Sequence, residues 1–217
     1  MSNARRNAYL EVLGLPAFVL RRRPDGGAPS DRSEAWTRLQ ARVAACTRCA
    51  LSATRTQTVF GVGDTRAAWL IVGEAPGAEE DRQGEPFVGR AGQLLNSMLR
   101  AIGLRREQVY IANVVKCRPP DNRDPKAEEI ASCRPYLEAQ RRAIQPTVVV
   151  SLGNFATKLL LDTELGITKV RGASYPMDGW TLVPTYHPAA ALRSGGVVVA
   201  EMRADLIRAK RLLEGSP

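Results

Sequence analysis

Apolar residues follow two alternating rhythms from about residue 67 to the end of the chain. Four short apolar runs, each with the length of a buried strand, lie at 67–73, 108–117, 147–153 and 180–186. Four longer segments with apolar residues at helical spacing lie at 91–102, 125–144, 154–161 and 199–214. Because buried strands that alternate with amphipathic helices pair in parallel, the pattern predicts an α/β fold with helices on both faces of a parallel sheet.

The chain ahead of residue 31 has a different character. Residues 4–14 have the spacing of a short amphipathic helix, whereas residues 21–30 are rich in arginine, glycine and proline, as linkers are. We therefore expect an N-terminal arm and linker at 1–30 and a single folded domain at 31–217.

Composition limits the classes of protein that fit. A chain of 217 residues with 44% apolar content can bury a substantial core. Its formal charge of +9 indicates a polyanionic partner, although a merely basic protein fits the charge equally well. No apolar run approaches the roughly 20 residues of a membrane span, and the start lacks the pattern of a signal peptide. We therefore expect a cytoplasmic protein with no membrane association.

The four cysteines are arranged as Cys46-x2-Cys49 and, farther along the chain, Cys117-x15-Cys133. In the cytoplasm thiols stay reduced, and they bind metals or clusters more often than they form disulfides. A closed zinc site usually has close pairs, whereas iron–sulfur ligation tolerates the wide second spacing. The spacing therefore favours an iron–sulfur centre, with zinc or two disulfides as the alternatives.

Basic residues accompany every cysteine in the sequence: Arg48, Lys116, Arg118 and Arg134. One hypothesis is that these side chains offset the negative charge of a thiolate cluster. The alternative is that they face a nucleic acid. Pro135 lies inside the predicted helix at 125–144, and it predicts a bend next to Cys133.

Open α/β sheets bind ligands beyond the carboxyl ends of their strands. In this chain the corresponding segments are 73–90, 113–125, 153–155 and 186–195. The functional side chains should therefore be sought in these four segments.

The loop Gly73-Glu74-Ala75-Pro76-Gly77 follows the first strand run. Its glycines and proline predict a tight turn whose backbone N–H groups can hold an oxyanion or a carbonyl oxygen. The loop lacks the Lys-Ser/Thr pair of a nucleotide triphosphate-binding loop, and an ordinary strand-to-helix turn fits it equally well.

Three further side chains in these segments carry chemistry. Phe87, in a loop between a proline and a glycine, suits a platform for stacking a flat ring, or else a core position. Asn113 is surrounded by apolar strand residues, so its amide needs a partner; it can read an imide edge or bond to a neighbouring loop. His187, the only histidine, follows a strand and precedes a proline, where a catalytic role competes with a structural one.

In combination, these segments resemble the family-4 uracil-DNA glycosylases, the iron–sulfur branch of that superfamily. The resemblance covers about residues 40–214 and depends on the cysteine spacing and on several ordered motifs. These motifs are GEAPGAEED (73–81), GEPFVGRAGQLL (84–95), NVVKCRPPDNRDP (113–125), VSLGNFA (150–156) and YHPAAALR (186–193).

The resemblance implies a four-stranded parallel sheet between helices and a hydrolase that cleaves the N-glycosidic bond of deoxyuridine in DNA. It implies a monomer that acts on uracil-containing DNA, single- or double-stranded, and leaves an abasic site. It also implies a [4Fe–4S] cluster, whose ligands would be Cys46, Cys49, Cys117 and Cys133.

The resemblance implies roles for the residues of the site as well. Once the base is rotated out of the duplex, Phe87 would stack on it and Asn113 would bond to its O4/N3 edge. Uracil departs as an anion, which His187 and the N–H groups of the loop at 74–77 would stabilise.

The same resemblance implies contacts to the DNA. Leu192 would enter the stack that the flipped base leaves, and Arg193 and Arg90 would contact the DNA backbone.

The sequence offers more than one candidate for the residue that activates water. The family-1 enzymes have an aspartate where this chain has Ala75, which fits family 4 but removes the obvious base. Glu74 and Glu80 are the candidates, and we favour Glu74. The reaction needs little base if the sugar cation forms first.

Two other classes of function fit parts of the sequence. A non-catalytic cluster protein that binds DNA or senses redox state explains the thiols and the charge, but gives Phe87, Asn113 and His187 no reason to converge. A hydrolase of small phosphorylated substrates is disfavoured by the missing Lys-Ser/Thr pair. Convergence of those three side chains is therefore the deciding observation.

Overall fold

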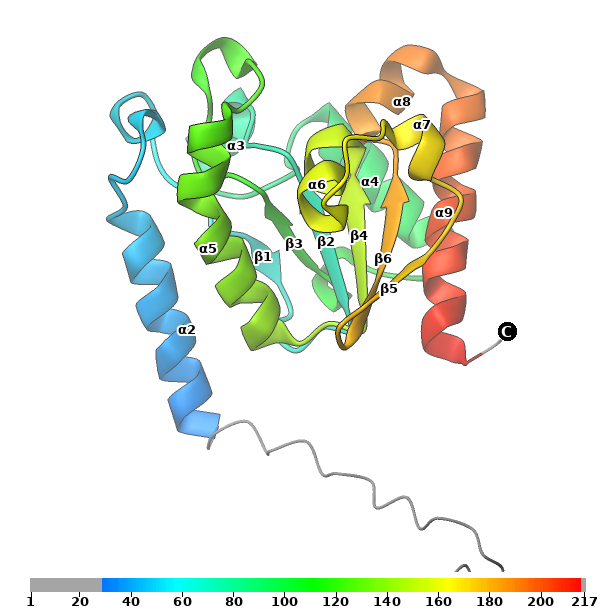
Figure 1. Cartoon of the computed structure of the whole chain (residues 1–217), viewed down its shortest axis with the longest axis horizontal. Coiled ribbons are helices and arrows are strands. Elements are labelled where there is room, and N and C mark those ends of the chain that lie inside the picture. The colour runs from blue at the N-terminus through cyan, green and yellow to red at the C-terminus, as the bar shows by residue number, and fades with distance from the viewer. Residues whose placement is uncertain (1–28, 216–217) are drawn as a thin grey trace, which may run out of the picture. The chain divides into compact units, whose positions relative to one another are not determined.

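A computed structural model describes residues 29–215 of the chain (Figure 1). The predicted helix at 4–14 lies outside the described residues, so that prediction stays open. The helices of the described part are α2 (Pro29–Ala44), η1 (Ala50–Ala53), α3 (Ala78–Gln83), α4 (Arg90–Ala101), η2 (Arg106–Gln108), η3 (Pro120–Asn122), α5 (Ala127–Ile144), α6 (Gly153–Leu161), α7 (Ile167–Val170), α8 (Pro188–Ser194) and α9 (Gly196–Glu214). The strands are β1 (Val62–Gly63), β2 (Trp69–Gly73), β3 (Tyr110–Asn113), β4 (Val148–Leu152), β5 (Tyr175–Met177) and β6 (Trp180–Thr185).

The strands form one sheet in the order β1-β3-β2-β4-β6-β5. The four predicted strands are β2, β3, β4 and β6, and they pair in parallel, which confirms the predicted class. The predicted strand number was wrong, because β1 and β5 add antiparallel edges to make six. These edges are two and three residues long, too short to show a strand period in the sequence.

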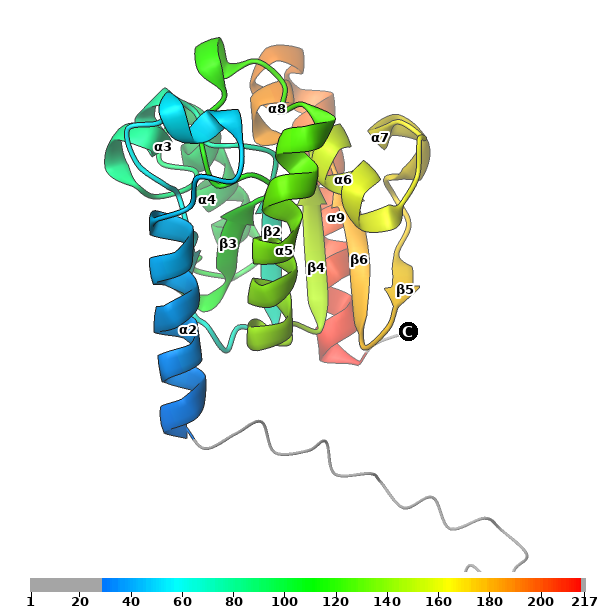
Figure 2. The same ribbon diagram turned by 60° about the vertical axis from the view of Figure 1, so that its left-hand side comes forward.

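The parallel strands are buried on both faces, because successive side chains of a strand point to opposite sides. Leu70 and Val72 of β2 pack in a core with residues of α5 and α6. Trp69 and Ile71 of the same strand pack with residues of α4, α8 and α9. Figures 1 and 2 show α5 and α6 on one side of the sheet and α4 and α9 on the other.

Two helices near the carboxyl ends of the strands have no counterpart in the predicted pattern. The α3 segment, AEEDRQ, is almost wholly polar, so it has no apolar period to detect. The α8 segment begins with Pro188 at its first position and is mostly alanine. The final helix also begins at Gly196, three residues before the predicted start.

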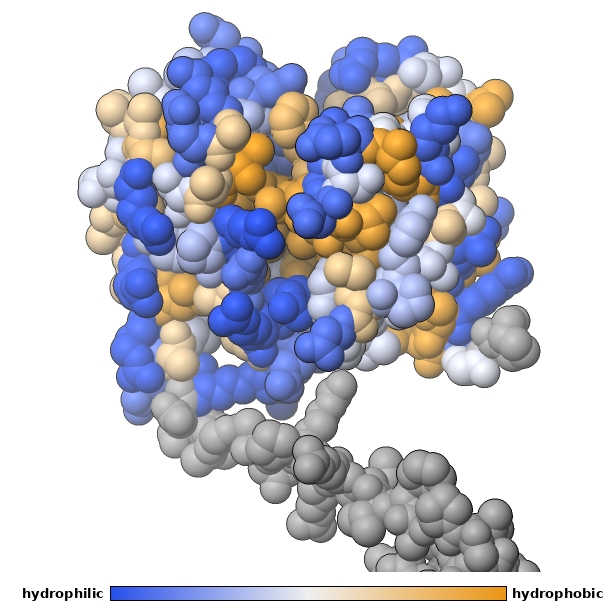
Figure 3. All heavy atoms as spheres, in the orientation of Figure 1, coloured by the Kyte–Doolittle hydropathy of each residue, from blue (hydrophilic) through white to orange (hydrophobic). Residues whose placement is uncertain are grey.

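Apolar side chains gather on the molecular face that carries α5 and α6 (Figure 3). A cavity of about 240 Å³ between these helices reaches Leu70 and Val72, and the guanidinium of Arg141 lies 5.1 Å from the ring centre of Trp180 at its edge. None of the helices that the structure describes has the length and apolarity needed to cross a membrane.

Candidate functional site

A cavity of about 600 Å³ opens at the carboxyl ends of the parallel strands. All four predicted segments contribute to its lining. Of the residues expected to form the site, the lining includes Glu74, Ala75, Gly77, Phe87, Asn113, His187 and Arg193. The three side chains whose convergence was the deciding observation therefore share one cavity.

Phe87 and Asn113 meet at Gly73, the last residue of β2. Gly73 lies beside Asn113 in the parallel register, and a Cβ atom at Gly73 would lie 2.4 Å from Asn113 Oδ1 and 2.6 Å from Phe87 Cζ. The rings of Phe87 and His187 have centres 5.6 Å apart and planes inclined by 34°. The aromatic ring is therefore a neighbour of both Gly73 and the imidazole.

The Glu80 carboxylate holds the two loops of the site together. Its Oε2 accepts a hydrogen bond from the N–H of Gly77 at 3.1 Å, and its Oε1 accepts from Val88 and Gly89 at 3.1 and 3.2 Å. Three backbone donors therefore occupy this carboxylate. The Gly77 N–H, which the sequence assigned to an oxyanion, is committed to Glu80.

Arg106 and Gly92 fix the backbone of Phe87, which has a left-handed conformation with φ of +55°. The Arg106 guanidinium donates to the carbonyl oxygens of Pro86 and Phe87 and to Oδ1 of Asn96. A Cβ atom at Gly92 would overlap the Phe87 carbonyl, so only glycine permits this approach. Left-handed backbone is unfavourable for a side chain such as phenylalanine, and the surrounding contacts must hold it there.

Asn113 has a buried hydrogen-bond acceptor that no protein group satisfies. Its side chain is 2% exposed, and Oδ1 has no hydrogen-bond partner among the described residues. An unpaired buried amide oxygen costs about 1–3 kcal/mol, so it indicates a site that a ligand donor completes.

His187 is the N-cap residue of α8, and its Nδ1 accepts a hydrogen bond from the N–H of Ala189 at 3.2 Å. Burial and the positive charge of Arg193 lower the pKa of His187 to about 4. At neutral pH the ring is therefore uncharged, and since Nδ1 is an acceptor the proton lies on Nε2. His187 offers one neutral N–H donor to the cavity.

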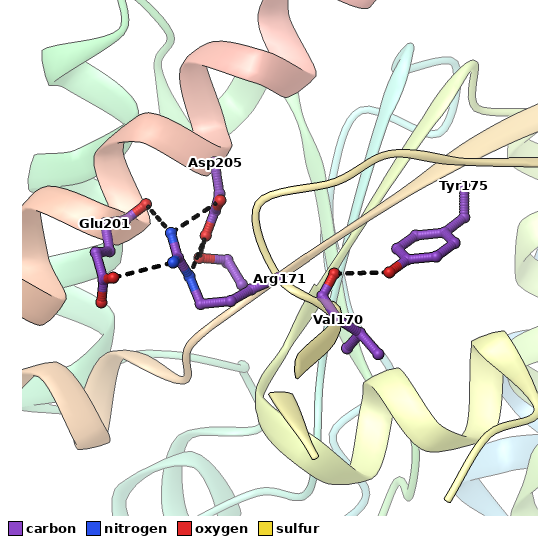
Figure 4. A network of polar contacts seen from close by, with 6 residues as sticks. Val170, Arg171, Tyr175, Glu201 and Asp205 are labelled. Atoms are coloured by element: carbon purple, nitrogen blue, oxygen red, sulfur yellow. Dashed lines mark hydrogen bonds and ion pairs between the residues drawn. The ribbon is translucent and has the colours of Figure 1, made fainter. Parts of the chain in front are cut away.

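Arg171, Glu201 and Asp205 form a partly buried ionic network (Figure 4). The Arg171 guanidinium donates to both oxygens of Asp205 at 3.1 Å and to Glu201 at 3.0 Å. Asp205 also accepts from the hydroxyl of Thr185, the last residue of β6, and Arg171 lies 5.2 Å from the ring centre of Tyr186. The network therefore ties α9 to the chain that carries the histidine.

Glu74 lies at the cavity with an altered acidity. Burial, and to a lesser degree the negative charge of Asp124, raises the pKa of Glu74 to about 7. Both residues line the cavity. A carboxylate with this pKa can accept a proton near neutral pH.

Two residues expected to contact DNA lie outside the cavity lining. Arg90 is exposed at the first position of α4, and the Leu192 side chain is 43% exposed on α8. The sequence did not indicate Arg106 as a residue of the site, because nothing in the local sequence relates it to the loop at Phe87. Nor did it indicate Tyr186 and Phe155, which line the cavity and lie inside the motifs at 186–193 and 150–156.

All four cysteines line a second cavity, and each is a free thiol. The alternative of two disulfides is therefore wrong in this structure. In the described part of the chain, no three histidine, cysteine or carboxylate side chains are arranged as a site for a metal ion.

Two basic residues donate to the cysteine sulfurs. Arg55 donates to Cys117 Sγ at 3.1 Å, and the backbone N–H of Lys116 donates to Cys133 Sγ at 3.2 Å. Burial raises the pKa of Cys133 to about 11. Burial also lowers the pKa of Lys116 to about 8, and the sulfurs of Cys133 and Cys117 offset part of this lowering.

The basic neighbours chosen from the sequence divide into two groups. Arg48 and Lys116 line the cysteine cavity. Arg118 and Arg134 do not line it, because their side chains bond instead to Asn122 and Glu138. Only two of the four basic residues chosen by proximity in sequence therefore line the cavity, and Arg55, which also lines it, was missed.

Comparisons with known proteins agree with this geometry. The profile of the Uracil DNA glycosylase superfamily matches residues 60–207. The chain is 50% identical to a type-4 uracil-DNA glycosylase of Archaeoglobus fulgidus over 158 residues, covering 69% of this chain and 79% of that protein. It is 48% identical to a type-4 enzyme of Thermotoga maritima, covering 75% and 86%. Similarity to a type-5 uracil-DNA glycosylase of Thermus thermophilus is lower, at 34% identity, covering 71% and 80%.

Proposed function

The chain belongs to the type-4 group of the uracil-DNA glycosylase superfamily, and from this we infer that it excises uracil from DNA in base excision repair. As a hydrolase it cleaves the N-glycosidic bond of deoxyuridine and leaves an abasic site. The base must first leave the helical stack, at a cost of a few kcal/mol.

One observation supports this function above the others: the Phe87 ring, the unpaired Asn113 Oδ1 and the Nε2–H of His187 converge on one cavity. A flat ring with one N–H flanked by two carbonyl groups matches this set. Phe87 stacks on the uracil ring, Asn113 Oδ1 accepts from N3–H, and the Asn113 NH₂ group donates to O4.

Stabilisation of the leaving group follows from the same geometry. As the glycosidic bond breaks, negative charge develops on the uracil O2. The neutral His187 donates Nε2–H to this oxygen, and the N–H of Ala75 is the second donor. A donor aimed at developing charge contributes about 3–4 kcal/mol to the transition state.

Glu74, rather than Glu80, is the residue that we assign to water. The Glu80 carboxylate already accepts three backbone N–H groups, which makes it a support for the loops. Glu74 lines the cavity, and its pKa is about 7. Near neutral pH its carboxylate can therefore accept a proton from water, and in its ionised form it can stabilise the cation that forms on the sugar.

Contacts to DNA complete the proposal. Arg193 lies at the cavity and contacts a phosphate, and the exposed Leu192 one residue earlier enters the stack that the base vacates. Arg90, exposed on α4, binds the backbone as well. We propose that the protein acts as a cytoplasmic monomer on single- or double-stranded DNA.

The cysteine cavity fits a [4Fe–4S] cluster held by Cys46, Cys49, Cys117 and Cys133. Its donor set consists of four thiols, and N–H groups from Arg55 and Lys116 reach two of the sulfurs, as is usual around such clusters. When bound, the cluster would join the segment around Cys46 to the catalytic domain. We assign it no step in the hydrolysis.

The experiment is cleavage of an oligonucleotide that contains a single uracil, followed by alkali. We expect strand scission with the wild-type protein, none with a thymine control, and a severe loss in Asn113→Ala. Binding without scission would favour the non-catalytic cluster protein. Iron and sulfide analysis of the purified protein tests the cluster separately.

A further inference from the structure

Lys116 lies between the cysteine cavity and the residue that reads uracil. Its side chain is 1% exposed, although it carries an ammonium group. Its Nζ donates to the backbone carbonyl oxygen of Asn113 at 2.8 Å, and its backbone N–H donates to Cys133 Sγ at 3.2 Å. One buried residue therefore contacts both sites.

Among residues 32–215, no aspartate or glutamate forms an ion pair with Lys116. The residue instead lines the cysteine cavity together with Cys117 and Cys133. An unpaired buried ammonium group is strongly destabilising, so some negative charge must balance it. A cluster with four thiolate ligands carries net negative charge.

We propose that Lys116 couples the two sites: its ammonium group balances the charge of the cysteine-bound cluster and, with the same group, holds the Asn113 carbonyl in place. Asn113 is the last residue of β3, and its backbone carbonyl oxygen is held by the ammonium group three residues farther along the chain. Lys116 is thus a positioning residue for uracil recognition. The inference depends on the cluster proposed above.

The test uses Lys116→Met, which keeps the length of the side chain but removes its charge and its donors. We expect inhibition by free uracil to weaken roughly tenfold, as the loss of a charge-assisted hydrogen bond predicts. We also expect the reduction potential of the cluster to become more negative at unchanged iron content, because a nearby positive charge is gone.

Two further variants make the test specific. Lys116→Gln keeps an N–H donor without the charge, so it should shift the potential as Lys116→Met does and weaken uracil inhibition less. Arg134→Gln is the matched control, because Arg134 follows Cys133 in the sequence but bonds to Glu138 outside both the cysteine cavity and the uracil site. It should change neither quantity.

An unchanged uracil inhibition constant or an unchanged potential in Lys116→Met would overturn the coupling. So would failure of both Lys116 variants to fold while Arg134→Gln folds, since the lysine would then be purely structural. Absence of iron or of uracil excision in the wild-type protein would instead reject the proposed function.

Discussion

A Cβ atom on Gly73 would lie 2.4 Å from Oδ1 of Asn113, the residue beside it at the end of the neighbouring strand, so there is no room for a larger residue at position 73. We therefore expect Gly73→Ala to displace both the amide and the Phe87 ring. A displacement of this kind lowers kcat/KM by on the order of 100-fold. Single-turnover cleavage of uracil DNA measures it.

Gly196→Ala is the control for this substitution, because a Cβ atom there meets no other group within 4 Å. It should retain wild-type activity. Normal excision by Gly73→Ala would show that the amide and ring are not held as closely as the structure indicates.

The second prediction concerns pH. If the Glu74 carboxylate acts in its ionised form, kcat/KM should rise with pH and level off above the pKa of about 7. Asp124 contributes to this raised pKa, so Asp124→Asn should lower it and move the acidic limb to lower pH. Glu74→Gln should remove the limb and most of the activity.

Pre-steady-state rates between pH 5 and 9 would measure the profile. Glu79→Gln serves as the control, since Glu79 is exposed and paired with Arg82. An acidic limb that persists unchanged in Glu74→Gln would assign it to another group.

The third prediction is that His187 stays neutral in the working range of pH. Burial and Arg193 hold its pKa at about 4, and the Ala189 N–H at Nδ1 selects the Nε2–H tautomer. Because the chain has one histidine, its ¹⁵N resonances can be assigned directly. They should report this tautomer down to about pH 5, and His187→Ala should slow excision by about 100- to 1,000-fold. A protonated ring at pH 6 would contradict the mechanism.

Much of the site follows from the sequence, because its residues lie at strand ends. Runs such as 67–73 and 147–153 are recognisable as strands from their apolar residues alone. Since all carboxyl ends of a parallel sheet meet at one edge, the positions of Asn113 and His187 followed from those of the strands. The chemistry of these side chains left structural roles open as alternatives, and the family resemblance is what related them to uracil.

What the sequence did not reveal depends on contacts between distant segments. Arg55 reaches Cys117 across 62 residues, and Arg106 reaches Phe87 across 19. Neither arginine differs in its local sequence from exposed arginines such as Arg105. Only the fold shows which charges are buried and which backbone groups they bind.

The last prediction follows from one such contact. Arg106→Ala would leave the carbonyl oxygens of Pro86 and Phe87 without their donor, and the left-handed backbone at Phe87 would lose a restraint. The free energy lost, about 1.5–3 kcal/mol for hydrogen bonds to a charged group, should weaken inhibition by free uracil about 10- to 100-fold. Arg106→Lys should recover part of the lost inhibition by uracil, because an ammonium group can reach one of the two carbonyl oxygens but not both.

The affinity for undamaged DNA separates this role from general unfolding. It should stay at the wild-type value in Arg106→Ala, because Arg106 holds the stacking ring and makes no proposed DNA contact. Arg105→Ala changes the exposed neighbour and should alter neither constant. If both uracil inhibition and DNA binding fell together in Arg106→Ala, the arginine would be supporting the whole domain rather than the ring.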